Sequence, residues 1–154
     1  MQKKNFASAL VQSIALDRLQ NENGSRLINL AQLALNNGDY ETSRNAYQAV
    51  IDKGPASSYY ITARIEKLQV SKEELALRPG SDSALYAALE NDYKATLNEL
   101  GKTHETAIMM KELAHIEAFH LNNSKDAVAL LREAIVLPGI FNKTQAICKL
   151  ELGD

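Results

Sequence analysis

Apolar residues recur along most of this chain at steps of three and four positions, which is the spacing of one face of an α-helix. One example is the series Leu85, Leu89, Tyr93, Leu97 and Leu100. No segment shows sustained alternation of β-branched and polar residues, so the pattern predicts no β-sheet. We expect an all-α chain of about eight helices. Six predicted helices cover about residues 5–21, 26–36, 57–77, 103–121, 124–136 and 142–154. A third helix follows Asp39 and includes Tyr40, Tyr47, Val50 and Ile51, and a fifth begins at Asp82 or Ser83 and ends at Gly101.

Short turns separate these helices. Each of the three prolines adjoins a glycine, in the pairs Gly54-Pro55, Pro79-Gly80 and Pro138-Gly139. Such pairs are typical of turns. Gly38 is expected to end the second helix in a left-handed conformation, which glycine adopts without a Cβ clash. Ser25 and Asp39 are predicted N-caps of the second and third helices. Connections of two to six residues favour antiparallel hairpins stacked side by side.

The clearest motif lies in residues 24–57. In its first half, Leu27 is the large residue, Leu30 the leucine and Ala31 the small residue of the motif. In its second half, the glycine turn is Asn37-Gly38-Asp39-Tyr40, the aromatic residue is Tyr47 and the proline is Pro55. This arrangement resembles a tetratricopeptide repeat, a pair of helices with a period of about 34 residues. The resemblance implies a right-handed superhelical stack of antiparallel helical hairpins.

A second repeat-like frame covers residues 108–141. Ala127 and Ala134 stand at the two small positions at which the paired helices of such a repeat approach closely. The frame departs from the family pattern at two places, because Asn122 replaces the turn glycine and His115 occupies a small-residue position. We therefore expect this frame to be a weaker version of the first.

The rest of the chain fits the repeat less well. Residues 58–101 are expected to form an elongated, irregular helical pair, with an insertion near residues 71–83. Residues 142–154 resemble the first helix of a further repeat without its second helix. The sequence thus predicts one helical-repeat domain over residues 1–154, cut from a longer repeat protein.

The last helix carries a further expectation. If its neighbour is missing, Ile147, Cys148 and Leu152 are left uncovered. Uncovered apolar surface is a site of association. The isolated chain is therefore expected to self-associate through its C-terminal end, or to fray there.

Composition narrows the range of partners. The chain has 154 residues, of which 45% are hydrophobic and 23% charged, and a net charge of −2. This balance lacks the basic surface that nucleic-acid binding needs. No apolar run approaches the roughly 20 residues of a membrane-spanning helix, and the N-terminus does not have the pattern of a signal peptide. We expect a soluble protein without a targeting signal; its compartment is left open, with the cytoplasm favoured.

Two pairs of acidic residues and histidines lie in the sixth predicted helix, as Glu112-x-x-His115 and Glu117-x-x-His120. Such pairs hold di-iron centres when they lie on different helices. Here the pairs are five residues apart on one helix, which rotates them by about 140° relative to each other. They therefore cannot converge on one metal ion. No metal, no other cofactor and no catalytic residue is predicted, and Cys148 is expected to be a small buried hydrophobe.

The resemblance implies instead a groove lined by the first helix of each hairpin. By position, the groove candidates are Ser25, Ile28, Gln32, Leu35, Asn36, Met109, Glu112, Ile116, Phe119 and His120. Some repeat proteins of this family bind a peptide's terminal carboxylate with a lysine, but Ile28 and Glu112 occupy that position here. A mixed apolar and polar lining fits a helix or an extended peptide.

The predicted function is therefore a non-catalytic scaffold. Its partner would be another protein, a peptide or another segment of the parent chain. The alternative is a helical-bundle enzyme or a small-ligand-binding domain with a site near the sixth helix. A further possibility for the groove is that Ile116 and Phe119 only pack against the elongated middle pair.

Overall fold

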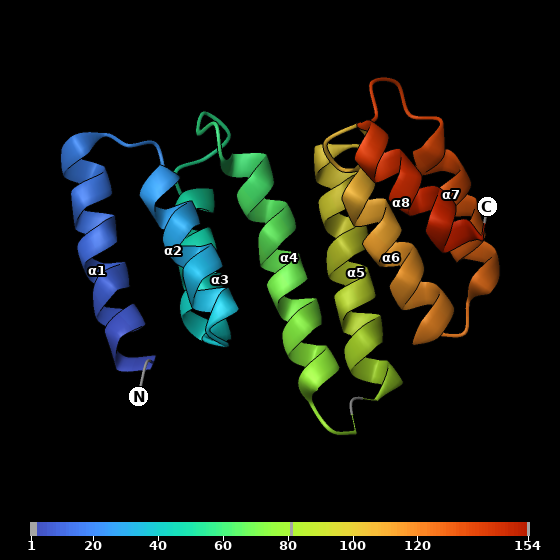
Figure 1. Ribbon diagram of the computed structural model, residues 1–154, viewed down its shortest axis with the longest axis horizontal. Helices are drawn as coiled ribbons and strands as arrows, with labels where there is room; N and C mark the ends of the chain where they lie inside the picture. Colours follow the sequence, from blue (N-terminus) through green and yellow to red (C-terminus); the bar gives the residue numbers. More distant parts are fainter. Residues whose placement is uncertain (1–2, 81, 154) are drawn as a thin grey trace. The chain divides into compact units, whose positions relative to one another are not determined.

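A computed structural model describes residues 3–80 and 82–153, and within them it contains eight α-helices and no strand (Figure 1). The expectation of an all-α chain is confirmed for this part. The helices are α1 (Lys3–Gln20), α2 (Ser25–Asn36), α3 (Tyr40–Ile51), α4 (Tyr60–Leu77), α5 (Ser83–Leu100), α6 (Ala107–Phe119), α7 (Ser124–Ile135) and α8 (Asn142–Leu152). The chain divides into two compact units, Met1–Leu77 and Arg78–Asp154. The first unit holds α1–α4 and the second holds α5–α8.

Of the two predicted caps, Asp39 is correct and Ser25 is wrong. The side chain of Asp39 accepts a hydrogen bond from the Thr42 N–H at the start of α3, and Asp82 does the same for Leu85 at the start of α5. Ser25, however, is the first residue of α2 and does not cap it. The N-cap is Gly24, which has a φ of 98°.

Tertiary contacts explain why Gly24 and not Ser25 is the N-cap of α2. The Gly24 N–H donates to Oδ1 of Asp17 at 2.7 Å, so a side chain seven residues earlier accepts this hydrogen bond. A Cβ at Gly24 would also lie 3.1 Å from Cγ1 of Val50, closer than nearly all Cβ contacts. Both the left-handed φ and the close approach of α3 therefore favour glycine here.

Two helices are shorter than their apolar spacing predicts. α4 begins at Tyr60 rather than residue 57, because Ser57 takes part in a turn in which its hydroxyl donates to the Asn23 carbonyl. α6 begins at Ala107 rather than residue 103. The Thr106 hydroxyl donates to the Gly101 carbonyl at 2.6 Å, which holds residues 101–106 in a turn.

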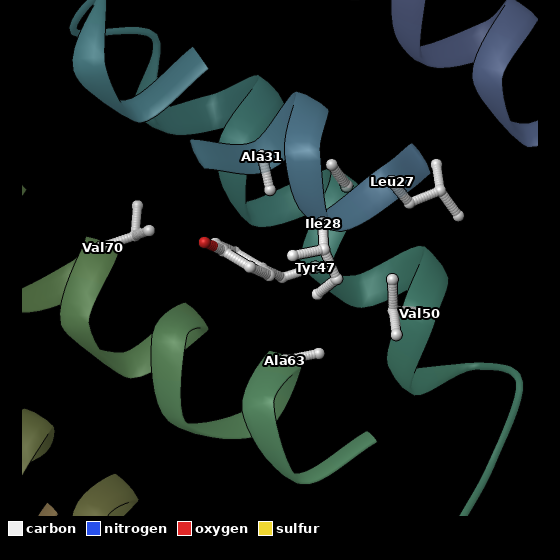
Figure 2. Close-up of a cluster of buried hydrophobic side chains, with 8 residues drawn as sticks. Leu27, Ile28, Ala31, Tyr47, Val50, Ala63 and Val70 are labelled. Carbon is white, nitrogen blue, oxygen red and sulfur yellow. The ribbon is translucent and has the colours of Figure 1, made fainter. Parts of the chain in front are cut away.

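The core of the first unit lies between α2, α3 and α4, and α1 packs against α2 and α3. Figure 2 shows the Tyr47 ring of α3 pointing toward Val70 of α4. The core residues are Leu27, Ile28, Ala31, Ala46, Tyr47, Val50, Ala63 and Val70. The spacing of Leu10, Ile14 and Leu19 predicts one apolar face for α1; this is correct for Leu10 and Ile14, which pack against the core, but wrong for Leu19, which is 82% exposed. The helix buries Asp17 instead.

The second unit is organised around α6, which contacts α5, α7 and α8. Its buried residues on α6 and α7 include Met109, Met110, Leu113, Ala114, Ile116, Ala127, Leu131 and Ala134. α8 packs against both α6 and α7. Cys148 is fully buried as a result, so the expectation that it is uncovered is wrong and the expectation of a small buried residue is confirmed. Ile147 and Leu152 are partly buried.

Candidate functional site

The five groove candidates of the first unit all lie on α2, but they differ in accessibility. Ile28 is buried in the core, and Leu35 packs against the same core. Ser25 is partly exposed, whereas Gln32 and Asn36 are exposed. The accessible candidates on α2 are therefore polar, because its apolar candidates contribute to folding, while the exposed apolar residue of this helix is Leu33, at 52%, which is not a candidate.

Two of the five candidates on α6 are likewise inaccessible. Met109 and Ile116 have no exposed surface. A partner could reach them only after rearrangement of the unit. The accessible candidates in the second unit are Glu112, Phe119 and His120.

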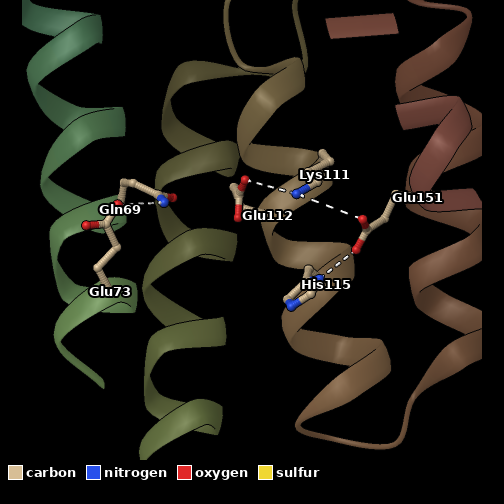
Figure 3. A network of polar contacts seen from close by, with 6 residues as sticks. All are labelled: Gln69, Glu73, Lys111, Glu112, His115 and Glu151. Carbon is tan, nitrogen blue, oxygen red and sulfur yellow. Dashed lines mark hydrogen bonds and ion pairs between the residues drawn. The ribbon is translucent and has the colours of Figure 1, made fainter. Parts of the chain in front are cut away.

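Glu112 belongs to a polar network that links α6 to α8 (Figure 3). The Lys111 ammonium lies 3.3 Å from Oε1 of Glu112 and 4.0 Å from Oε2 of Glu151 on α8. The other oxygen of Glu151 lies 2.6 Å from Nδ1 of His115. The contacts of Glu151 with Lys111 and His115 join α8 to α6, so part of the polar surface of α6 stabilises the packing of α8.

The C-terminal turn of α6 carries a group of aromatic rings. Phe119 is 70% exposed, and its ring centre lies 4.6 Å from that of His115. The His120 ring stacks on Tyr86 of α5, with centres 3.7 Å apart and an angle of 5° between the planes. His120 is thus held against α5, whereas the Phe119 ring is open to solvent.

The two acidic and histidine pairs of the sequence have different partners. Glu112 contacts Lys111 of its own helix, and Glu117 contacts Lys94 of α5. Over residues 3–80 and 82–153, no three His, Cys, Asp or Glu side chains are placed so that they could hold a metal ion.

A cavity of about 360 Å³ lies between α5, α6 and α7. Leucines and an alanine provide its apolar walls, and charged side chains and an asparagine provide the rest. The lining residues are Lys94, Leu97, Asn98, Lys102, Leu113, Glu117, Asp126, Ala129, Leu130 and Glu133. Ligand sites commonly have this combination of a largely apolar wall with a few polar groups.

Glu117 is the unusual member of this lining, because its side chain is only 1% exposed. Its Oε1 lies 3.2 Å from the Lys94 ammonium, while its Oε2 has no hydrogen-bond partner among the described residues. Burial raises the pKa of Glu117; Lys94 opposes the rise, and Glu90 and Asp126 add to it. Lys94 itself is shared, since its ammonium lies 2.5 Å from Oε1 of Glu90.

Sequence reasoning named Glu117 and, as an alternative function, a ligand site near the sixth helix, but it did not predict that Glu117 is buried and paired, although one signal was present. Glu117 lies three and four residues after the apolar Ala114 and Leu113, on the same face of the helix. A charged residue within an apolar stripe is a candidate for burial with a partner. Its partner, Lys94, is 23 residues away, and nothing in the local pattern connects the two.

Comparisons with protein-family models, with curated proteins and with solved structures find no match. None of the helices in the described part of the chain is both long enough and apolar enough to cross a membrane. Function must therefore be argued from the site.

Proposed function

We propose that this chain is a non-catalytic interaction module, built from helical hairpins of the tetratricopeptide type, that binds a protein or peptide segment. The packing within each unit supports the hairpins. α2 packs on α3 and α3 on α4 in the first unit, and α6 packs on α7 and α7 on α8 in the second. Within each unit, each helix thus contacts the next one in the chain, as stacked hairpins require.

The observation that carries the proposal is the exposed ring of Phe119. It projects from the end of α6, 70% exposed, beside the partly exposed His115, which is itself in contact with Glu151. Aromatic side chains with a polar surround dominate the binding energy of many protein interfaces. The accessible groove candidates Glu112 and His120 lie on the same helix, so we assign the contact surface to α6.

The chemistry of the remaining candidates favours binding over catalysis. The Cys148 thiol is fully buried, and burial raises its pKa, which disfavours the reactive thiolate. His115 is engaged by Glu151. Neither group is arranged as a nucleophile with a neighbouring base.

The test is selection of peptide ligands from a displayed random library with the complete chain, followed by affinity measurement on two variants. Phe119→Ala should weaken the selected peptides at least tenfold, because loss of a central aromatic contact exceeds about 1.4 kcal/mol. Phe141→Ala is the matched control, since Phe141 is also exposed, at 57%, but lies outside α6. It should change affinity less than twofold.

Two results would contradict the proposal. One is a selection that enriches no binding peptide. The other is a set of peptides that bind the Phe119→Ala variant as tightly as the parent, with circular dichroism showing that both are folded.

A second candidate function is binding of a small ligand in the cavity between α5, α6 and α7. Its volume of about 360 Å³ falls in the range of roughly 300–1,000 Å³ that is common for ligand pockets. This candidate can coexist with peptide binding, because Phe119 and the other groove candidates are not among the residues that line the cavity.

A further inference from the structure

The cavity of the second unit contains an incomplete ion pair. Buried carboxylates are normally engaged at both oxygens, since each unpaired lone pair carries a desolvation cost. Glu117 departs from this rule, because Oε2 has no hydrogen-bond partner within the described residues. Its single ionic contact, at 3.2 Å, is longer than the contact that the same lysine makes with Glu90.

The charges around the cavity are also unbalanced. Three carboxylates line it, those of Glu117, Asp126 and Glu133, against the two ammonium groups of Lys94 and Lys102. Lys102 pairs with Glu133 at 2.7 Å, and Lys94 is shared with Glu90, which lies outside the lining. The lining thus has one cation fewer than it has carboxylates, and Glu117 shares its cation, Lys94, with Glu90.

We propose that this cavity binds a primary ammonium group carried on an alkyl chain, with the Glu117 carboxylate as its acceptor. The proposal rests on the second candidate function and names the ligand chemistry of that site. The ammonium would donate to Oε2 of Glu117, the oxygen that lacks a partner; this atom is buried in the structure, so the ammonium reaches it only when the Lys94 side chain moves aside. The alkyl chain would lie against the apolar walls formed by Leu97, Leu113 and Leu130.

The geometry favours an ammonium over other cations. A guanidinium is best bound by two oxygens of one carboxylate, and Lys94 already contacts Oε1 of Glu117. A divalent metal ion requires several oxygen ligands, and the described residues hold no such group. A primary ammonium can bind through one N–H to a single oxygen, which matches what Glu117 offers.

Lys94 controls access to this acceptor. Its side chain is 45% exposed and contacts Glu117 from α5. Long lysine side chains keep their charged end mobile in water. The Lys94 ammonium can therefore shift toward Glu90 while a second ammonium enters beside Glu117.

The experiment is a titration of the ¹⁵N-labelled complete chain with pentylamine, followed by amide chemical shifts. Pentan-1-ol and pentanoate are the neutral and anionic controls of the same length. The amine should give saturable shifts in α5, α6 and α7, and the two controls should bind at least tenfold more weakly. A short peptide with one lysine, compared with its norleucine counterpart, tests whether the ammonium can be that of a partner's side chain.

Variants identify the acceptor. Glu117→Gln keeps the shape of the side chain but removes its charge, so it should weaken the amine at least tenfold. Glu133→Gln is the matched control, because Glu133 also lines the cavity but is 47% exposed and already paired with Lys102. It should change affinity less than threefold. Lys94→Met should strengthen amine binding severalfold, since it removes the competing ammonium, and this gain does not depend on the stability of the Gln variant.

The outcomes distinguish failure of the ammonium proposal from failure of the second candidate function. If pentylamine and pentan-1-ol bind equally well, the cavity is an apolar ligand site and the ammonium proposal is wrong, while the second candidate function survives. If no probe gives saturable shifts with the parent or with the Lys94→Met variant, both are wrong. Binding of the free amine, the lysine peptide or both supports ammonium recognition, and the tighter of the two shows its source.

Discussion

Asp17 in the first unit and Glu117 in the second are both almost fully buried carboxylates, at 0% and 1% exposure, and they are used differently. Oδ1 of Asp17 accepts from the Gly24 N–H at 2.7 Å, and Oδ2 forms an ion pair with the Lys53 ammonium, although it has no hydrogen-bond partner within the described residues. Glu117 in the second unit is equally inaccessible, but only Oε1 has an ionic partner, Lys94, and Oε2 has no hydrogen-bond donor in the described part of the chain.

Under our proposal, this difference separates a structural role from a binding role. Asp17 joins the end of α1 to the start of α2 and accepts a hydrogen bond from the N–H of the cap residue Gly24, so contacts within the fold compensate for its burial. Oε2 of Glu117 is buried without a hydrogen-bond partner in the described part of the chain, and Glu117 lines a cavity. We assign the missing partner to a ligand, because ionisable groups with perturbed pKa values are common at functional sites.

The largest expected effect comes from breaking the Asp17 contacts. Asp17→Ala should lower the free energy of unfolding by about 3 kcal/mol, because it leaves the Gly24 N–H and the Lys53 ammonium without their acceptor. Urea denaturation of parent and variant measures the change. Asp52→Ala is the control, since Asp52 is exposed, and it should stay within about 0.5 kcal/mol of the parent. If the free energy of unfolding falls as little in Asp17→Ala as in the control, Asp17 has no structural role and the contrast between the two units does not hold.

A second prediction compares the two units at the alanines where their helices pack closely. Ala134 and Ala127 on α7 are 0% and 3% exposed, and Ala34 on α2 is 0% exposed. Leucine at any of the three should destabilise by about 1–3 kcal/mol, because the added carbons have no room between packed helices. Thermal melting followed by circular dichroism measures the loss, and Ala146→Leu, at an exposed position of α8, is the control. Variants at 127 and 134 that melt with the parent would show that the second repeat frame is misplaced.

The smallest effect concerns the pH dependence of stability. Burial raises the pKa of Glu117 above its ordinary value of 4.5, so the folded state keeps this proton to higher pH than the unfolded state does. The parent is therefore expected to lose stability as the pH rises from about 4.5 through the raised pKa of Glu117, whereas Glu117→Gln has no such group to ionise.

The measurement is urea denaturation of both proteins between pH 4 and pH 8. The stability of the parent relative to the Gln variant should fall across that window and level off above it. Glu133→Gln, which alters a half-exposed carboxylate, should follow the pH dependence of the parent. Parallel curves for the parent and Glu117→Gln would mean that Glu117 ionises no less readily in the fold than in the unfolded chain, and that its burial is fully compensated.

Local pattern predicted the helices well, because a helix is built from contacts between residues three and four apart. The same local reasoning predicted the cap Asp39, whose acceptor oxygen binds an N–H group only three residues ahead, and the cap Asp82 has the same local geometry. Helix ends were predicted less well where distant residues intervene, as at Ser57, whose hydroxyl donates to the carbonyl of Asn23, 34 residues earlier. The accessibility of the groove candidates was also predicted less well. Spacing put Met109 and Ile116 on the expected binding face, but packing against neighbouring helices buries them.

The amino-acid sequence by itself determined the helical character of the chain, its turns and the apolar stripe of most helices. Only the tertiary structure decided which faces are covered, and hence that Asp17 is buried while Leu19 is exposed. It also decided that Glu117 meets Lys94 across two helices beside a cavity. The physical reason is that spacing along a helix shows which residues share a face, whereas burial and pairing depend on a neighbouring helix whose residues are far away in the chain.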